Sequence, residues 1–275
     1  MNLFHRVSQV ANAHGNTRVA SVMRIALACL LWVKWAGPMR LFTGVGREQP
    51  WLAVAFWVAT TCMLVGLFSR LACFASGIVG LVLFYWLGMA EGQSQWIHHH
   101  TYLMCVAVLV LGFACPGGSL SVDRWRLVQS ARSRGESPPP EWGAQLGLTL
   151  IGLQVSAVYF WGAVNKLQAE WMTGETLEWV VAAWYFGSDM PDIPGFHAAM
   201  IVANALVVVI EFALAIGLWF PRFHRVLIPL GLLLHAGMYY LLPVSIFSFL
   251  MAVLYLAYVP PGRFQQAMDD LMGGT

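Results

Sequence analysis

Eight long apolar runs constrain this chain more than any other feature of its sequence. They lie at about residues 19–38, 51–69, 71–90, 100–115, 145–165, 198–220, 226–242 and 244–259. A membrane-spanning helix needs about 20 largely apolar residues, whereas a membrane-spanning strand shows about 10 residues of alternating character. Because the runs are continuous, the sequence predicts an all-α fold, a polytopic transmembrane helical bundle of about eight spans, with seven to nine as the range.

The composition agrees with this class. Hydrophobic residues make up 59% of the 275 residues and charged residues 10%, whereas soluble domains carry about 25% charged residues. These values exclude a soluble globular protein, and the net charge of +2 is too small to favour nucleic acid as a partner. Since eight spans use about 160 residues, we expect a single transmembrane domain over residues 1–275 without a separate soluble domain. The expected location is the cell membrane, with the lipid bilayer as partner.

Basic residues are distributed unevenly over the segments between the runs. With the N-terminus inside, ten arginines fall in inside segments and three basic residues, Lys166 among them, fall outside. Positive charge accumulates on the cytoplasmic side of membrane proteins. We therefore predict cytoplasmic termini, Arg70 at the cytoplasmic surface and an external segment after Lys166. Arg24 and Lys34 lie within the first run. Arg24 is interpreted as an inner-leaflet residue, and Lys34 could extend to the outer headgroups.

Several ionisable residues lie at membrane depth, where they are costly and therefore candidates for function. On the predicted topology the outer half of the bundle holds His98, His99, His100 and His235, and Glu211 lies mid-span. His235 could instead hydrogen-bond a neighbouring helix, and Glu211 could pair with a buried cation.

The three consecutive histidines do not make a metal site. Adjacent helical residues project about 100° apart, so at most two of them can meet one ion. The five cysteines form no CxxC pair, the spacing typical of a metal or redox site. We therefore expect no metal.

Lys166 is the strongest functional candidate. It closes the fifth run after an aromatic, amide-bearing stretch that holds Tyr159, Trp161 and Asn165. Apolar surroundings disfavour the charged form of an amine, and a neutral amine can accept a proton. Lys166 can therefore act as a base, or alternatively extend to the headgroups.

The stretch from Tyr159 to Gly174, YFWGAVNKLQAEWMTG, resembles the HTTM (horizontally transferred transmembrane) domain family and, within it, the membrane domain of the vitamin K-dependent γ-glutamyl carboxylases. The shared features are a tyrosine-rich helix end, a lysine–leucine pair, an acidic residue, a tryptophan and a glycine. Residues 66–70 (GLFSR), 100–103 (HTYL) and 121–123 (SVD) agree with further motifs in the same order. The last two runs, with His235 and the Phe247–Ser248 pair, also fit. The resemblance covers about residues 51–261.

The resemblance implies a membrane enzyme with an outward-facing, periplasmic or exterior site. In the carboxylases a lysine amine deprotonates vitamin K hydroquinone, oxygen adds, and the strong base so formed takes a hydrogen from a peptide glutamate. Carbon dioxide then adds, and the quinone leaves as the epoxide, which is carbon–carbon lyase chemistry. Lys166 matches that lysine, and His100 matches a histidine that assists it.

The implied cofactors are a reduced quinone, either vitamin K or menaquinone-like, with O2 and CO2. The implied partners are the lipid quinone and a secreted or membrane-bound peptide, which is either carboxylated or otherwise modified. Candidates for binding substrate or quinone are His99, Tyr159, Trp161, Asn165, Trp171, His235 and Tyr239. Arg70 and Glu211 are expected to be structural polar residues.

Two other functions are open at this stage. The carboxylases carry a large lumenal region that grips the peptide, and some have a second lysine at the position of Asn165. The alternative is therefore a non-catalytic membrane factor that assists maturation or export of a secreted peptide. A transporter is disfavoured, because the inner half of the predicted bundle has few ionisable groups and the sequence shows no internal repeat.

Overall fold

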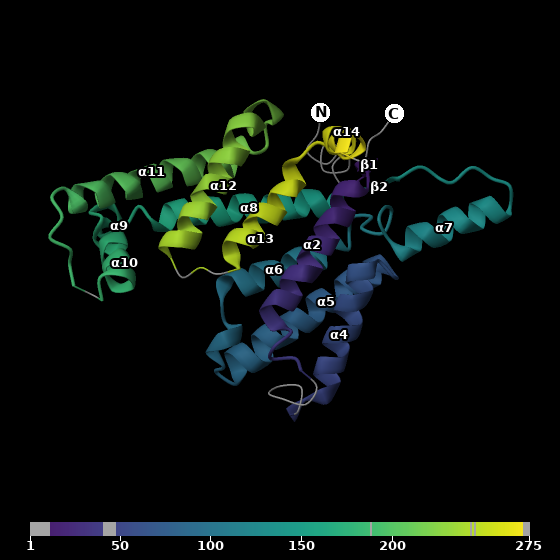
Figure 1. Ribbon diagram of the computed structural model, residues 1–275, viewed down its shortest axis with the longest axis horizontal. Coiled ribbons are helices and arrows are strands. Elements are labelled where there is room, and N and C mark those ends of the chain that lie inside the picture. The colour runs from purple at the N-terminus through teal and green to yellow at the C-terminus, as the bar shows by residue number, and fades with distance from the viewer. Residues whose placement is uncertain (1–11, 41–47, 188, 243, 245, 272–275) are drawn as a thin grey trace. The chain divides into compact units, whose positions relative to one another are not determined.

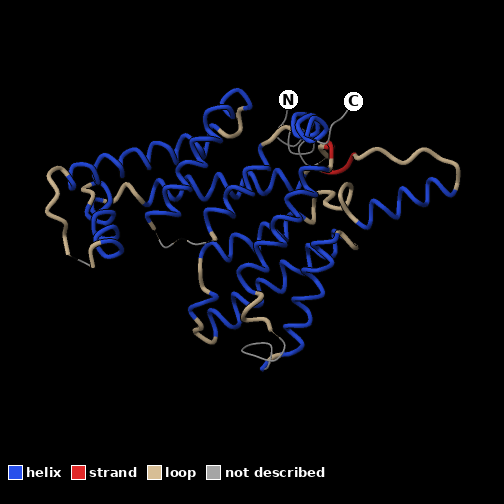
Figure 2. Tube along the Cα trace, in the orientation of Figure 1, coloured by secondary structure: helices blue, strands red, loops and turns tan. Residues whose placement is uncertain are grey.

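The computed structural model describes residues 12–40, 48–187, 189–242, 244 and 246–271. These residues are mostly helical (Figures 1 and 2). They form two compact units, the first made of Met1–Gly152 with Val259–Thr275 and the second of Leu153–Tyr258.

Four of the described helices pack together in the first unit. Its elements are β1 (His14–Asn16), α2 (Arg18–Trp35), α4 (Pro50–Val65), α5 (Ser69–Val82), η1 (Leu83–Ala90), η2 (Ser94–Trp96), α6 (His99–Leu111), α7 (Val122–Ser133), β2 (Trp142–Ala144), the start of α8 (Leu146–Asn165) and α14 (Pro261–Leu271). Helix α5 packs against α4 and α6, and α2 packs against α4. The core between them holds fully buried apolar side chains such as Met23, Trp35 and Phe56.

The second unit continues α8 and adds α9 (Ala169–Met172), α10 (Glu175–Tyr185), α11 (Phe196–Gly217), η3 (Pro221–Phe223), α12 (His224–Leu241), α13 (Phe247–Leu254) and η4 (Tyr255–Tyr258). Helix α11 packs against α10 and α12, and α12 packs against α13. The buried residues of α11 are Asn204, Val208, Glu211, Leu214 and Ala215. Their spacing of three to four residues places them on one face, so two polar residues of α11 point inward.

Each of the eight predicted runs coincides with a helix, which supports the membrane-helical class. Among the described residues, three helices are long and apolar enough to cross a membrane, namely Ser69–Ala90, Leu146–Asn165 and Phe196–Gly217. A fourth results if Phe247–Tyr258 and Gly262–Asp270 form one broken span. Pro50–Val65 and His99–Leu111 are apolar but shorter. Eight spans and cytoplasmic termini thus stay predictions.

Two features were not predicted from the sequence. The first is the antiparallel pair β1–β2, in which Gly15 lies opposite Gly143; three-residue strands are too short to show an alternating pattern. The second is α7, a polar helix between two apolar runs. Its signal is Ser121, whose side chain accepts a hydrogen bond from the Arg124 amide and caps the helix.

Arg24, which lies in the first apolar run, is 0% exposed inside the first unit. Its guanidinium donates to the main-chain oxygens of Leu64 (2.7 Å), Pro116 (2.9 Å), Leu120 (2.7 Å) and Met63. The last carbonyls of a helix have no partner within it. Arg24 therefore ties the end of α4 to the segment before α7, and hydropathy could not show that this face of α2 meets protein rather than lipid.

Two of the stretches that carry the family resemblance meet in the first unit. The Asp123 carboxylate accepts hydrogen bonds from the Phe68 amide (2.9 Å), the Ser69 amide (2.7 Å) and the Ser69 hydroxyl (2.7 Å). It thereby caps the start of α5. Gly66 has φ 72°, and a Cβ there would lie 2.4 Å from Cβ of Ser121, so only glycine fits the turn.

We expect Asp123→Ala to lower the free energy of unfolding by about 1–2 kcal/mol, because it leaves the first amides of α5 without an acceptor. The measurement is thermal or denaturant unfolding of the purified protein in detergent micelles. The control is Asp270→Ala, which removes an exposed carboxylate from α14. Equal stability of the two variants would show that the cap contributes nothing.

Candidate functional site

Several polar residues of the second unit lie along one face of α8 and the turn that follows it. Ser156, Tyr159, Gly162 and Lys166 recur every three or four residues, so they lie along the same side of the helix. Most of the other residues of α8 are apolar, and the helix is long enough to cross a membrane. Polar groups on one stripe of such a helix are candidates for function.

Lys166 and Glu211 form an ion pair between the end of α8 and the middle of α11. The Lys166 Nζ donates to both carboxylate oxygens of Glu211, at 2.8 and 2.9 Å, and the side chains are 18% and 8% exposed. Gly162 makes room for the carboxylate, since a Cβ there would lie 3.3 Å from Glu211 Oε2. The Trp171 ring centroid lies 5.5 Å from the ammonium, a cation–π distance.

This pairing joins two residues that the sequence treated separately. Lys166 was expected to be a base, and Glu211 a structural residue with a buried cation beside it. In the structure an amine and a carboxylate share one site, where low exposure weakens competition from water. Such a pair can gain or lose one proton. The charge on each partner offsets the change in charge on the other. The arrangement suits acid–base chemistry.

A second polar cluster, two turns earlier on α8, holds Tyr159, His235 and Tyr255. The Tyr159 hydroxyl lies 2.6 Å from His235 Nε2 and also hydrogen-bonds the Tyr255 hydroxyl. The three residues are at most 3% exposed. Seven residues of α-helix rise about 10.5 Å, so Tyr159 and Lys166 occupy successive levels of the same face.

Asn204 supports Trp171. Its Nδ2 donates to the Trp171 main-chain oxygen, and the residue is 1% exposed. Its Oδ1 has no hydrogen-bond partner among the residues that the structure describes. Because Asn204 precedes Glu211 by seven residues on α11, both face the Lys166 side of that helix.

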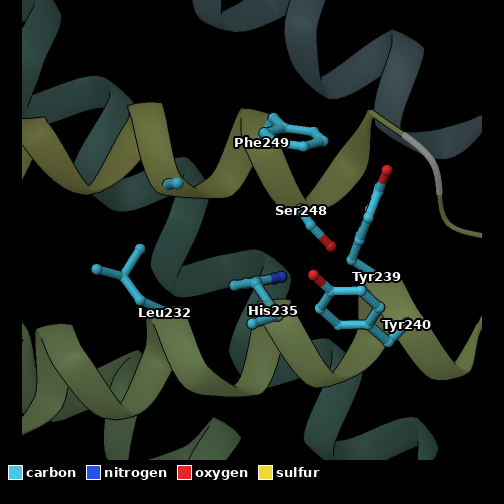
Figure 3. A pocket seen from close by; sticks show the side chains of 8 residues that line it. Leu232, His235, Tyr239, Tyr240, Ser248 and Phe249 are labelled. Atoms are coloured by element: carbon cyan, nitrogen blue, oxygen red, sulfur yellow. The ribbon is translucent and has the colours of Figure 1, made fainter.

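The other predicted binding residues of the second unit lie at its surface. Trp161 is 59% exposed and Tyr239 is 45% exposed, and Asn165 is also exposed. Tyr239 lies on α12 beside a cavity of about 270 Å³ that His235 and Ser248 also line (Figure 3). Their roles in binding a substrate or quinone stay predictions.

His98, His99 and His100 belong to the first unit. The rings of His98 and His100 stack at 5.0 Å, and His99 is exposed. Partial burial lowers the pKa of the His98 imidazole, and the Lys34 ammonium adds to this effect. Because Lys166 lies in the second unit, a pocket shared by His100 and Lys166 stays a prediction.

Arg70 is exposed, and its Nε donates to the Gly112 main-chain oxygen at 3.1 Å. In the described part of the chain, no group of three or more His, Cys, Asp or Glu side chains could hold a metal ion.

Gly162, Asn204 and Tyr255 were not singled out from the sequence. Asn204 carried a usable signal, since a polar residue seven positions before Glu211 in an apolar run marks one helix face. Tyr255 carried a weaker one, because tyrosine is also common at membrane interfaces. Gly162 had none, since its role depends on which helix packs against α8.

The family model for the HTTM domain matches residues 45–262 of the chain, more than half of its length. The matched range includes the Lys166–Glu211 pair and the Tyr159 cluster. No solved structure matches the chain.

Proposed function

The chain belongs to the HTTM domain family, which is related to the membrane part of vitamin K-dependent carboxylase, and from this premise we propose that it is a membrane enzyme that deprotonates a lipid-soluble quinol. The observation that carries the proposal is the Lys166–Glu211 ion pair, held at 2.8 Å on the inward faces of two apolar helices. Structural pairs of this kind also occur, so the test must measure chemistry as well as stability.

Trp171, which lies beside the Lys166 ammonium, and Asn204, which hydrogen-bonds Trp171, could contact the head of a quinol. Asn204 Oδ1 is a buried acceptor without a partner among the described residues and could receive a hydroxyl hydrogen. The Trp171 ring offers a flat apolar surface, and the pair offers a proton acceptor. When bound, a reduced quinone would supply the electrons for chemistry with O2, and CO2 would be the carbon added if the reaction is a carboxylation.

In this proposal the pair accepts the hydroxyl proton. The Lys166 ammonium first passes one proton to the Glu211 carboxylate, which leaves a neutral amine beside a carboxylic acid. The quinol O–H bond then breaks, its proton goes to the Lys166 amine, and the electron pair stays on the quinol oxygen. Lys166 is then an ammonium beside an anion, which it stabilises in a site of low exposure. Glu211 orients the amine through both carboxylate oxygens, and Trp171 shields the pair from water. His100 is proposed to assist, as the resemblance implies.

Purified protein in lipid nanodiscs should consume a short-chain menaquinol in the presence of O2 and form the quinone epoxide, which mass spectrometry can measure. Adding labelled bicarbonate and a glutamate-containing peptide would report carboxylation. Absence of any quinol-dependent product would contradict the proposal and favour the non-catalytic membrane factor that assists maturation or export of a secreted peptide.

We further propose that the pair faces the exterior, with eight spans and both termini in the cytoplasm. A topology reporter fused after Gly135 should then report a cytoplasmic location, because the arginine-rich segment stays inside. A reporter fused at Asp189 should report an external location. The reverse pattern would remove the outward-facing site.

A further inference from the structure

Helix α11 turns back into α12 through η3 (Figure 1), and an apolar groove of about 550 Å³ lies beside this turn in the second unit. A Cβ at Gly217 would lie 2.3 Å from Leu227 Cδ1, so the two helices are in close contact at this glycine. Ile216 is 60% exposed and Val226 is 66% exposed, so the groove is open at the surface. Its lining residues are all apolar or glycine, namely Phe212, Ala213, Ile216, Gly217, Phe223, Val226 and Leu227.

The turn after α11 lies at the level of lipid headgroups when this helix crosses a bilayer. Helix α11 has 22 residues and is apolar enough to span, and a helix of this length rises about 33 Å, close to the thickness of the hydrocarbon core. Trp219 and Phe220 follow the helix directly and are exposed, as is typical of aromatic residues at a membrane interface. The groove therefore extends from the headgroups toward the acyl chains.

Two arginines lie at the headgroup end of the groove. The Arg222 guanidinium lies 4.6 Å from the Phe223 ring centroid and 5.5 Å from that of Phe220, both cation–π distances, and Phe223 lines the groove. Arg225 follows three residues later and precedes Val226, so it lies on the same side of the helical turn as Arg222. Both arginines are exposed. Neither forms an ion pair with a carboxylate in the part of the chain that the structure describes.

We propose that this groove binds one anionic phospholipid, with an acyl chain along the apolar wall and the phosphate at Arg222 and Arg225. A guanidinium can donate two parallel hydrogen bonds to a phosphate, and the apolar wall begins next to both arginines. A zwitterionic lipid offers the same chains, but its own cation offsets the phosphate charge. A soluble phosphate meets the arginines but leaves the apolar wall uncovered.

Three ligands that share parts of this structure test the site in the full chain purified in detergent. Phosphatidylglycerol and phosphatidylcholine are used with identical acyl chains, and glycerol 3-phosphate supplies the phosphate without chains. Native mass spectrometry of the titrated protein gives an apparent Kd for each ligand. We expect phosphatidylglycerol to bind about 10–30-fold more tightly than phosphatidylcholine, which is about 5-fold for each arginine. Glycerol 3-phosphate should show no saturable binding over the same range.

Variants locate the binding. The double variant Arg222→Gln/Arg225→Gln should reduce the preference for phosphatidylglycerol to within about 2-fold and leave phosphatidylcholine nearly unchanged. The matched control is Arg132→Gln/Arg263→Gln, which removes two exposed arginines of the first unit and should keep the preference. Ala213→Trp should fill the groove and weaken both lipids, because it occupies the space of the acyl chain that they share.

Equal affinity for the two lipids, or a preference that the Arg222/Arg225 variant leaves unchanged, would overturn the proposal. Glycerol 3-phosphate binding as tight as that of phosphatidylglycerol would overturn it in favour of a soluble anion. An equal loss of preference in the control variant would overturn it in favour of a general charge effect, and unchanged binding to Ala213→Trp would exclude the groove. Because the readout is binding and not turnover, the outcome is independent of the proposed acid–base role of Lys166.

Discussion

Lys166→Ala should lower the rate of quinol oxidation by at least about 100-fold, the effect expected when a general base is removed. Lys166→Arg should lose activity as well, because guanidinium does not release its proton at accessible pH and cannot present a neutral nitrogen. The chain offers a matched control, since Lys34 is its one other lysine. Lys34→Ala should retain quinol oxidation, measured in nanodiscs with the same menaquinol.

The structure indicates that Lys166→Ala also lowers the stability of the protein. A lysine at a helix end usually contributes little to packing, but here the substitution leaves the 8%-exposed Glu211 carboxylate without its cation. The activity loss must therefore be measured on protein that elutes as a single folded species. Full activity in both the Ala and Arg variants would reduce Lys166 to a structural partner of Glu211.

Breaking the ion pair from either side should destabilise the second unit. Removing one partner of a buried pair typically costs about 3–5 kcal/mol, and we expect about 2–4 kcal/mol here because Lys166 is 18% exposed. Lys166→Met and Glu211→Leu should each show this loss. The double variant should lie within about 1 kcal/mol of the unsubstituted protein, because apolar side chains of similar volume often replace a buried pair without loss.

Denaturant unfolding of the four proteins in micelles gives the coupling energy between the two residues. Additive effects of the two substitutions would mean that the residues do not interact in solution. The double variant also separates stability from chemistry, since it should fold normally and fail to oxidise quinol.

The helices of this protein could be predicted because each apolar run is long, and a lipid environment forces the backbone to satisfy its hydrogen bonds within the run. Arg24 shows what hydropathy alone cannot predict. Hydropathy identifies the run that contains it, but the partners of the guanidinium are carbonyls from α4 and the segment before α7, which only packing brings together.

In the candidate site, too, single residues could be predicted from the sequence, but their contacts could not. Lys166 stood out from its own neighbours in sequence, whereas the partner Glu211 lies 45 residues away. Identifying Glu211 as the partner requires knowledge of the rotation of α11 relative to α8. The role of Gly162 can be recognised only after that rotation is known. Tyr159 and His235 were candidates separately, but their bond, and the Tyr255 hydroxyl beside it, depends on three helices meeting.

Chemical rescue of Lys166→Ala by small primary amines tests the central claim most directly. If the Lys166 amine accepts the quinol proton, methylamine and related amines should restore part of the oxidation rate in the space that the lysine side chain leaves. The rate should rise with amine concentration and with the basicity of amines of similar size, while guanidine should restore nothing. A rate that no amine changes, or one that depends on amine size but not on basicity, would contradict Lys166 as the base.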